Sequence, residues 1–159
     1  MPPQSTTLLS NSYARVYGKS GRAFVCVRSS GRITTLQGAS PVMSKFALAG
    51  TYVAWSSGTG QTVVKVMHVP NLVIIAKQYP YDTNNHVDRI VVKANGAAAW
   101  AATPSDDNTY VQGFDRSNHS ADLLSDDTLN VRGTSLRSLA GKAISWQYTD
   151  GTTGTANLY

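Results

Sequence analysis

The chain has 159 residues and a mass of 17.0 kDa, which is the size of one domain. Hydrophobic residues make up 42% of the sequence and charged residues 14%, whereas an average soluble domain has about 25% charged residues. This composition is typical of a folded rather than a disordered chain, and no apolar run approaches the roughly 18 residues of a membrane-spanning helix. The single cysteine, Cys26, excludes an internal disulfide framework and a cysteine-rich zinc site.

The beginning of the chain, residues 1–4, lacks the basic residues and the apolar core of a signal peptide. If the protein is exported, we therefore expect the signal to have been removed already. The sequence contains 17 serines and 16 threonines, which take the place of charged residues. This composition favours an extracellular or cell-surface location.

The charged residues are distributed unevenly. Residues 1–81 contain eight basic residues and no acidic one, whereas residues 82–159 contain six basic and nine acidic residues, all of them Asp. Such asymmetry indicates an interaction surface or a self-complementary molecule. The simpler alternative is a chance scatter of few charges.

The chain is built from a repeat, which its three tryptophans reveal. Trp55, Trp100 and Trp146 are 45 and 46 residues apart, and a glycine precedes each by four or five positions: Gly50, Gly96 and Gly141. Residues 48–55 and 139–146 share the pattern Leu-Ala-Gly, four further residues, and Trp. An earlier copy is predicted at residues 9–16, where Asn11 takes the place of the glycine because Asn tolerates positive φ. We expect the tryptophans to be buried at equivalent positions and the glycines to lie in equivalent turns.

The predicted elements are short strands separated by polar turns. In chain order, β-rich runs lie at 23–27, 33–36, 62–66, 73–76, 97–102, 109–114, 120–124 and 155–159, beside the runs that lead to Trp55 and Trp146. The run at 97–102 is rich in alanine, but Gly96 precedes it and Pro104 follows it, so we expect a buried strand rather than a helix. No segment shows sustained helical periodicity.

Four antiparallel strands in about 40–46 residues are typical of one blade of a β-propeller. The segments LAGTYVAW and LAGKAISW resemble those of bacterial WD40-like or TolB-like repeat propellers, although the Trp-Asp dipeptide is absent. The resemblance implies one all-β, propeller-like domain over 1–159, with units at about 5–38, 39–84, 85–128 and 129–159. The fourth unit ends after its third strand. A β-sandwich or other barrel is the alternative fold.

Catalytic and metal-binding motifs are not found. His68, His86 and His119 are not spaced as metal ligands, and no nucleophile can be paired with a base. Two Asp pairs, at 106–107 and 126–127, fit solvated turns better than calcium sites. We therefore expect no enzyme activity, no cofactor and no metal.

A basic run, interleaved with Tyr13, Tyr17 and Phe24, is the candidate interaction surface; it consists of Arg15, Lys19, Arg22, Arg28 and Arg32. The favoured function is a non-enzymatic interaction or self-assembly module that forms a homo-oligomer or binds another protein. Contact between N-terminal and C-terminal surfaces would close a ring or extend a filament, and residues 5–9 could supply the missing strand of the last unit. The alternatives are a glycan- or ligand-binding propeller and a nucleic-acid binder that uses the basic half.

Overall fold

The computed structural model describes residues 5–58, 62–80, 86–105, 108–117 and 119–159. Within these ranges the chain forms four antiparallel sheets, each made of strands that are consecutive in the sequence. The predicted all-β, propeller-like fold is confirmed. We name the sheets blades 1 to 4 in chain order.

The strand bounds follow the blades. Blade 1 contains β1 (Thr6–Ser10), β2 (Ala14–Lys19), β3 (Arg22–Val27) and β4 (Ile33–Thr35). Blade 2 contains β5 (Phe46–Ala49), β6 (Tyr52–Ser57), β7 (Val63–His68) and β8 (Val73–Gln78). Blade 3 contains β9 (His86–Val92), β10 (Ala98–Thr103), β11 (Tyr110–Phe114) and β12 (Ala121–Leu123). Blade 4 contains β13 (Arg137–Ser138), β14 (Ala143–Gln147) and β15 (Thr153–Asn157), preceded by the 3₁₀ turn η1 (Gly133–Ser135).

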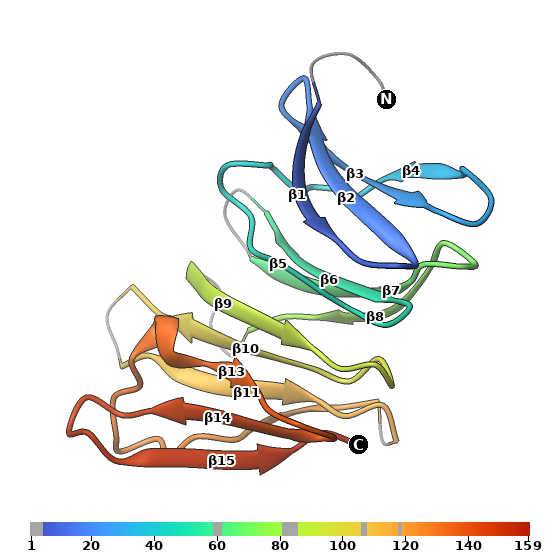
Figure 1. Ribbon diagram of the computed structural model, residues 1–159. Helices are drawn as coiled ribbons and strands as arrows, with labels where there is room; N and C mark the ends of the chain where they lie inside the picture. Colours follow the sequence, from blue (N-terminus) through green and yellow to red (C-terminus); the bar gives the residue numbers. More distant parts are fainter. Residues whose placement is uncertain (1–4, 59–61, 81–85, 106–107, 118) are drawn as a thin grey trace.

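The blades follow one another in a row, so that blade 1 and blade 4 lie at opposite ends (Figure 1). The first strands of successive blades are in contact, β1 with β5, β5 with β9, and β9 with β13. None of the helices in the described ranges is long and apolar enough to cross a membrane.

The core consists of three apolar layers, one between each pair of successive blades. Side chains alternate between the two faces of a strand, so each central strand supplies one row to each neighbouring blade. In β6, Val53 and Trp55 pack against blade 1, whereas Tyr52 and Ala54 pack against blade 3. The blades are therefore held together by side chains, and each blade needs a neighbour to bury its apolar face.

The junction of blades 3 and 4 also contains a buried cation. Lys93, which is 4% exposed, follows β9 directly. Its Nζ atom donates hydrogen bonds to Ser138 Oγ at 2.9 Å and to the Leu139 carbonyl oxygen at 2.7 Å. Burial lowers the pKa of this lysine below its ordinary value of 10.5. Because neither partner carries a charge, the lysine joins the two blades without an ion pair.

The structure corrects the expectation for residues 5–9. Instead of completing the last blade, Thr6–Ser10 form β1 and pair with β2 in blade 1. The adjoining turn also differs from the prediction, since Asn11 is not among the residues with positive φ in the described chain. Its side chain accepts hydrogen bonds from the Tyr13 and Ala14 amides instead. Asn11 thus replaces the glycine by forming a side-chain turn rather than by adopting a left-handed conformation.

Candidate functional site

The candidate site is the outer face of blade 1, which no described part of the chain covers as a neighbouring blade. Ala14 and Val16 of β2 and Ala23 and Val25 of β3 pack against blade 2. Alternation along these strands places the intervening side chains on the opposite face. We call this surface the blade 1 end face; it comprises Arg15, Tyr17, Lys19, Arg22, Phe24 and Ile33.

An aromatic pair forms the centre of the blade 1 end face. Tyr17 and Phe24 are paired across β2 and β3, with ring centroids 5.4 Å apart and ring planes inclined by 17°. The Arg15 guanidinium lies 5.3 Å from the Tyr17 centroid, and its Nε donates a hydrogen bond to Thr7 Oγ1 at 2.8 Å. Arg15 therefore covers the ring by a cation–π contact and is fixed in place by β1.

A hollow of about 560 Å³ adjoins the aromatic pair. It is lined by Tyr17, Lys19, Ser20, Arg22, Phe24 and Ile33. Tyr17 is only 5% exposed, and this burial, followed by the charge of Cys26, raises the pKa of its phenol, whereas Arg15 lowers it. The phenol is consequently neutral at physiological pH. The hollow combines an apolar floor with cations at its rim.

Tyr17 occupies the place that a tryptophan holds in the other blades. In blades 2, 3 and 4 the tryptophan lies on the second strand and packs against the preceding blade. In blade 1 the aromatic residue on the corresponding face of the second strand is Tyr17, between Arg15 and Lys19, whereas Val16 packs against blade 2. The predicted copy at residues 9–16 ends on Val16, at the position that corresponds to the tryptophans. This correspondence is therefore wrong by one residue, and such a slip turns a side chain to the other face of the strand.

The structure brings together three of the five basic residues in the candidate surface. Arg15, Lys19 and Arg22 border the aromatic pair. Arg28 instead donates hydrogen bonds to the Asn11 carbonyl and to Ser10, so it holds the turn between β1 and β2. Arg32 is exposed in the turn that precedes β4.

The repeat positions lie at corresponding places in blades 2 to 4. Trp55, Trp100 and Trp146 are all buried. Trp55 Nε1 donates to the Gln37 carbonyl at 3.3 Å and Trp100 Nε1 to Gln112 Oε1 at 3.2 Å, whereas Trp146 Nε1 is buried and has no hydrogen-bond partner within the described ranges. The turns between the first two strands of these blades contain the glycines, all with positive φ: Gly50, Gly96 and Gly141.

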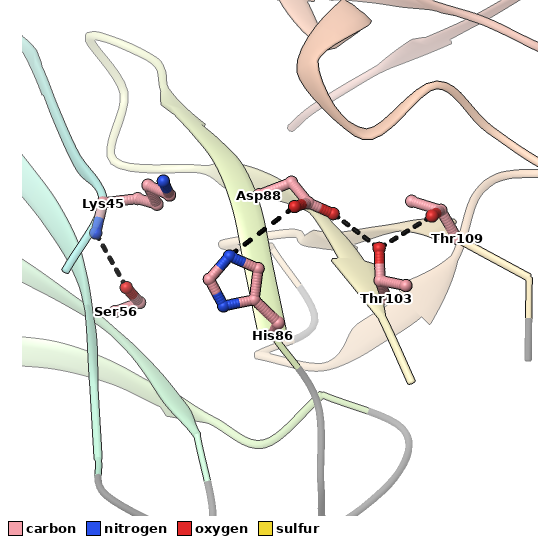
Figure 2. Close-up of polar contacts among 6 residues, drawn as sticks. All are labelled: Lys45, Ser56, His86, Asp88, Thr103 and Thr109. Atoms are coloured by element: carbon pink, nitrogen blue, oxygen red, sulfur yellow. Dashed lines mark hydrogen bonds and ion pairs between the residues drawn. The ribbon is translucent and has the colours of Figure 1, made fainter. Parts of the chain in front are cut away.

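A second polar cluster lies on and beside β9, the first strand of blade 3, and consists of His86, Asp88, Thr103 and Thr109 (Figure 2). His86 Nε2 is 3.7 Å from Asp88 Oδ1, and Thr103 Oγ1 donates to Asp88 Oδ2 at 2.6 Å. The Thr103 and Thr109 hydroxyl oxygens are 2.7 Å apart. The carboxylate lies between the imidazole and the hydroxyls, whereas nucleophilic catalysis needs the imidazole next to the hydroxyl. The cluster is therefore not a catalytic triad.

The same region borders a groove of about 630 Å³, lined by residues of β5 and β9 together with Leu9, Lys45, Thr134 and Ser138. Sequence reasoning did not identify Asp88, Thr103 and Thr109 as neighbours. No local motif could have done so, because β9, β10 and the segment before β11 meet only when blade 3 folds.

Of the two Asp pairs noted in the sequence, the pair at 126–127 lies in a turn that the Asp126 side chain helps to form. Asp126 accepts hydrogen bonds from the Thr128 amide at 2.8 Å and the Thr128 hydroxyl at 2.6 Å, and these bonds lower the pKa of its carboxyl group. Residues 106 and 107 lie outside the described residues. Across the ranges that the structure describes, no three His, Cys, Asp or Glu side chains gather as metal ligands would.

No protein-family model matches the sequence, and no curated protein matches it. The fold is nevertheless similar to solved structures that include propeller-type proteins. The dipeptidyl peptidase 4 of Porphyromonas gingivalis has a TM-score of 0.66 and 8% identity over 89% of this chain, which spans only 29% of that protein's chain.

Two further similar structures match nearly the whole chain. In the complex of KlAtg21 with the coiled coil of AgAtg16, the TM-score is 0.66 at 12% identity, covering 96% of this chain and 52% of that chain. For the computationally designed Ika4 protein, the TM-score is 0.62 at 16% identity, covering 98% of this chain and 93% of that chain. At sequence identities this low, the similarity shows a shared fold and nothing about function. The chain therefore has propeller-like blades in common with these proteins.

Proposed function

We propose that the chain is a non-enzymatic protein-interaction module that assembles with other copies of itself through the blade 1 end face. The observation that carries this proposal is the position of Tyr17, which takes the place where each later blade has a tryptophan packed on its neighbour. Because Tyr17 is already buried within the blade, the apolar surface left for a partner is that of Phe24, which is partly exposed, and Ile33, which is 51% exposed.

Blade 4, at the opposite end of the molecule, is a poor candidate for the surface of a second copy that would bind the blade 1 end face. The free face of blade 4 is mainly polar: it contains Ser145, Gln147, Thr153, Thr155 and Asn157, together with Ala143 and the basic Arg137. In blades 1 to 3 the face turned toward the next blade is formed mainly by Ala and Val. A polar face offers little apolar surface to Phe24 and Ile33, so head-to-tail packing of blade 4 on blade 1 is not favoured.

Charge indicates a different partner surface. Residues 5–38 contain five basic residues and no acidic one, whereas residues 85–128 contain three basic and seven acidic residues, for a net charge of −4. Residues 129–159 contain three basic residues and one acidic residue, so the last unit is itself basic. On the outer strand of blade 3, Asp122 and Leu123 are exposed beside each other, and Asp127 follows nearby. The negative charges of Asp122 and Asp127 complement the cations at the rim of the hollow beside Phe24.

The comparisons are compatible with an interaction role but do not supply a partner. One similar structure is a complex with a coiled coil of another protein. Another is a peptidase, of which the chain spans 29%. Because the His86 imidazole contacts Asp88 and not a hydroxyl, we favour binding over catalysis.

Light scattering tests the proposal directly. The wild type is expected to show an average mass above its monomer mass of 17.0 kDa at low salt, and Phe24→Asp or Arg22→Asp is expected to return it to the monomer. Thr155→Asp is the matched control, because it adds a carboxylate to the free face of blade 4 and should leave the mass unchanged. A wild type that stays monomeric at high concentration and low salt would refute self-assembly.

Nucleic-acid binding is the second candidate, favoured by the gathering of Arg15, Lys19 and Arg22 around two aromatic rings. Aromatic rings and cations together can stack bases and neutralise phosphates. Fluorescence anisotropy with single-stranded DNA and RNA at two salt concentrations tests it, and binding that is absent or independent of salt would exclude it. The glycan alternative has less support, because the exposed tyrosines Tyr13, Tyr79 and Tyr159 belong to blades 1, 2 and 4 and form no common platform.

A further inference from the structure

The connection between blades 1 and 2 exposes two adjacent apolar side chains. Val42 is 87% exposed and Met43 is 73% exposed. Both lie in the loop of residues 40–44, between β4 and β5. Single exposed apolar residues are common on protein surfaces, but two large ones at the tip of one loop are unfavourable in water unless something covers them.

Hydrogen bonds within the loop hold this tip in place. The Ser44 amide donates to the Ser40 carbonyl at 3.0 Å, and the Ser40 amide donates to Ser44 Oγ at 3.0 Å. Ser40 Oγ in turn accepts hydrogen bonds from the Val42 and Met43 amides, each at 3.3 Å. Pro41 packs against Gly18 so closely that a Cβ at Gly18 would be 2.8 Å from the proline ring. The loop therefore projects its apolar side chains from a fixed base.

The surroundings of the tip are polar and basic. Pro41 and Val42 line a hollow together with Lys19, Ser20 and Gly21, the turn between β2 and β3. Lys19 is paired across that turn with Arg22. The first 81 residues contain no acidic residue at all, so no carboxylate of blade 1 neutralises these cations.

We propose that the 40–44 loop inserts Val42 and Met43 into the headgroup region of an anionic lipid bilayer. A projecting apolar tip beside cations matches an interface in which hydrocarbon lies behind a layer of negative phosphates. A second copy of the chain fits the tip less well, because the hollow of about 560 Å³ on blade 1 is itself rimmed by Lys19 and Arg22. Docking the tip there would bring like charges together.

Vesicle cosedimentation tests the proposal with the full chain. At low salt we expect binding to vesicles of phosphatidylcholine mixed with phosphatidylserine, and little binding to phosphatidylcholine alone. The double variant Val42→Ser/Met43→Ser should weaken the partition by ~10-fold or more, because both apolar side chains are lost from the bilayer contact. The matched control is Val73→Ser/Ile74→Ser, which changes two exposed apolar residues on the outer strand of blade 2 and should bind as the wild type does.

A second measurement reports insertion itself. In Met43→Trp, the added indole should shift its emission to the blue when phosphatidylserine vesicles are present, since it moves from water to a less polar environment. Three results would overturn the proposal: no binding to either vesicle at low salt, equal binding by the Val42→Ser/Met43→Ser variant, or no emission shift on binding. A lower mass of that variant in light scattering without vesicles would identify the tip as a contact between copies and would also overturn it.

Discussion

At the residue scale, the turn glycines Gly96 and Gly141 differ in how much space the Cβ atom of a substituted alanine would have. At Gly96, φ is +90°, and a Cβ would lie 2.8 Å from the Tyr52 ring and 3.1 Å from Ile75. At Gly141, φ is +60°, and a Cβ would have no heavy atom within 4 Å. We expect Gly96→Ala to lower the free energy of unfolding by about 2–4 kcal/mol, through backbone strain and overpacking, and Gly141→Ala by about 1–2 kcal/mol through strain alone. Urea denaturation measures both, and equal effects would contradict the packing at Gly96.

The tryptophans allow a second residue-scale prediction. Trp100 Nε1 donates to the buried Gln112 side chain, whereas Trp146 Nε1 has no partner. Trp100→Phe should therefore cost more stability than Trp146→Phe, by about 1–3 kcal/mol, because it leaves the Gln112 oxygen unpaired. Replacement of either residue with Ala should cost about 3–5 kcal/mol. Denaturant titrations measure both variants. If Trp146→Phe lowers the free energy of unfolding more than Trp100→Phe does, the hydrogen bond to Gln112 does not determine the difference in stability between them.

At the element scale, Lys93 makes the junction of blades 3 and 4 sensitive to pH. Its folded-state pKa is lowered by burial, so the unfolded chain holds this proton more tightly than the folded protein does. Between the folded-state pKa and the ordinary value of 10.5, the contribution of Lys93 to stability therefore rises with pH. The wild type should gain stability relative to Lys93→Met as the pH increases from neutral toward 10.5.

Thermal or chemical unfolding at several pH values measures this difference. Lys77→Met removes an exposed lysine from β8 and controls for the loss of a surface charge. The free energy of unfolding of the wild type minus that of Lys93→Met should rise with pH. If this difference stays constant or falls, the Lys93 charge is not destabilised by burial in the folded protein.

The sequence was most informative about elements whose pattern is local. Strand lengths, polar turns and the spacing of the tryptophans predicted four blades, and the alanine-rich β10 is a buried strand despite its helix propensity, because the neighbouring blades override local preference. Val16 was misaligned because blade 1 lacks the tryptophan that fixes the register elsewhere. The residues that meet across strands, such as Asp88 and Thr103, have no signature within either segment.

At the scale of the whole molecule, the net negative charge lies in one blade and is not spread over the C-terminal half of the chain. The negative unit is residues 85–128, and the units on either side of it are basic. Any contact between copies that joins blade 1 to blade 3 should weaken with salt, because the Debye length falls from about 10 Å at 0.1 M to about 3 Å at 1 M. A contact between blade 1 and blade 4 should not be weakened by salt in this way, because both blades are positively charged and repel each other at low salt.

Charge reversal separates the two surfaces of this contact. Lys19→Asp/Arg22→Asp alters the blade 1 end face, and Asp122→Lys/Asp127→Lys alters the outer side of blade 3. Each variant alone should be monomeric in light scattering at low salt. An equimolar mixture should assemble again, because the intact, acidic blade 3 of the first variant meets the intact, basic blade 1 of the second, and the two charge-reversed surfaces are also of opposite charge. If the wild type assembles but the Asp122→Lys/Asp127→Lys variant assembles equally well, blade 3 is not the partner surface, although the blade 1 end face can still be the site of self-assembly.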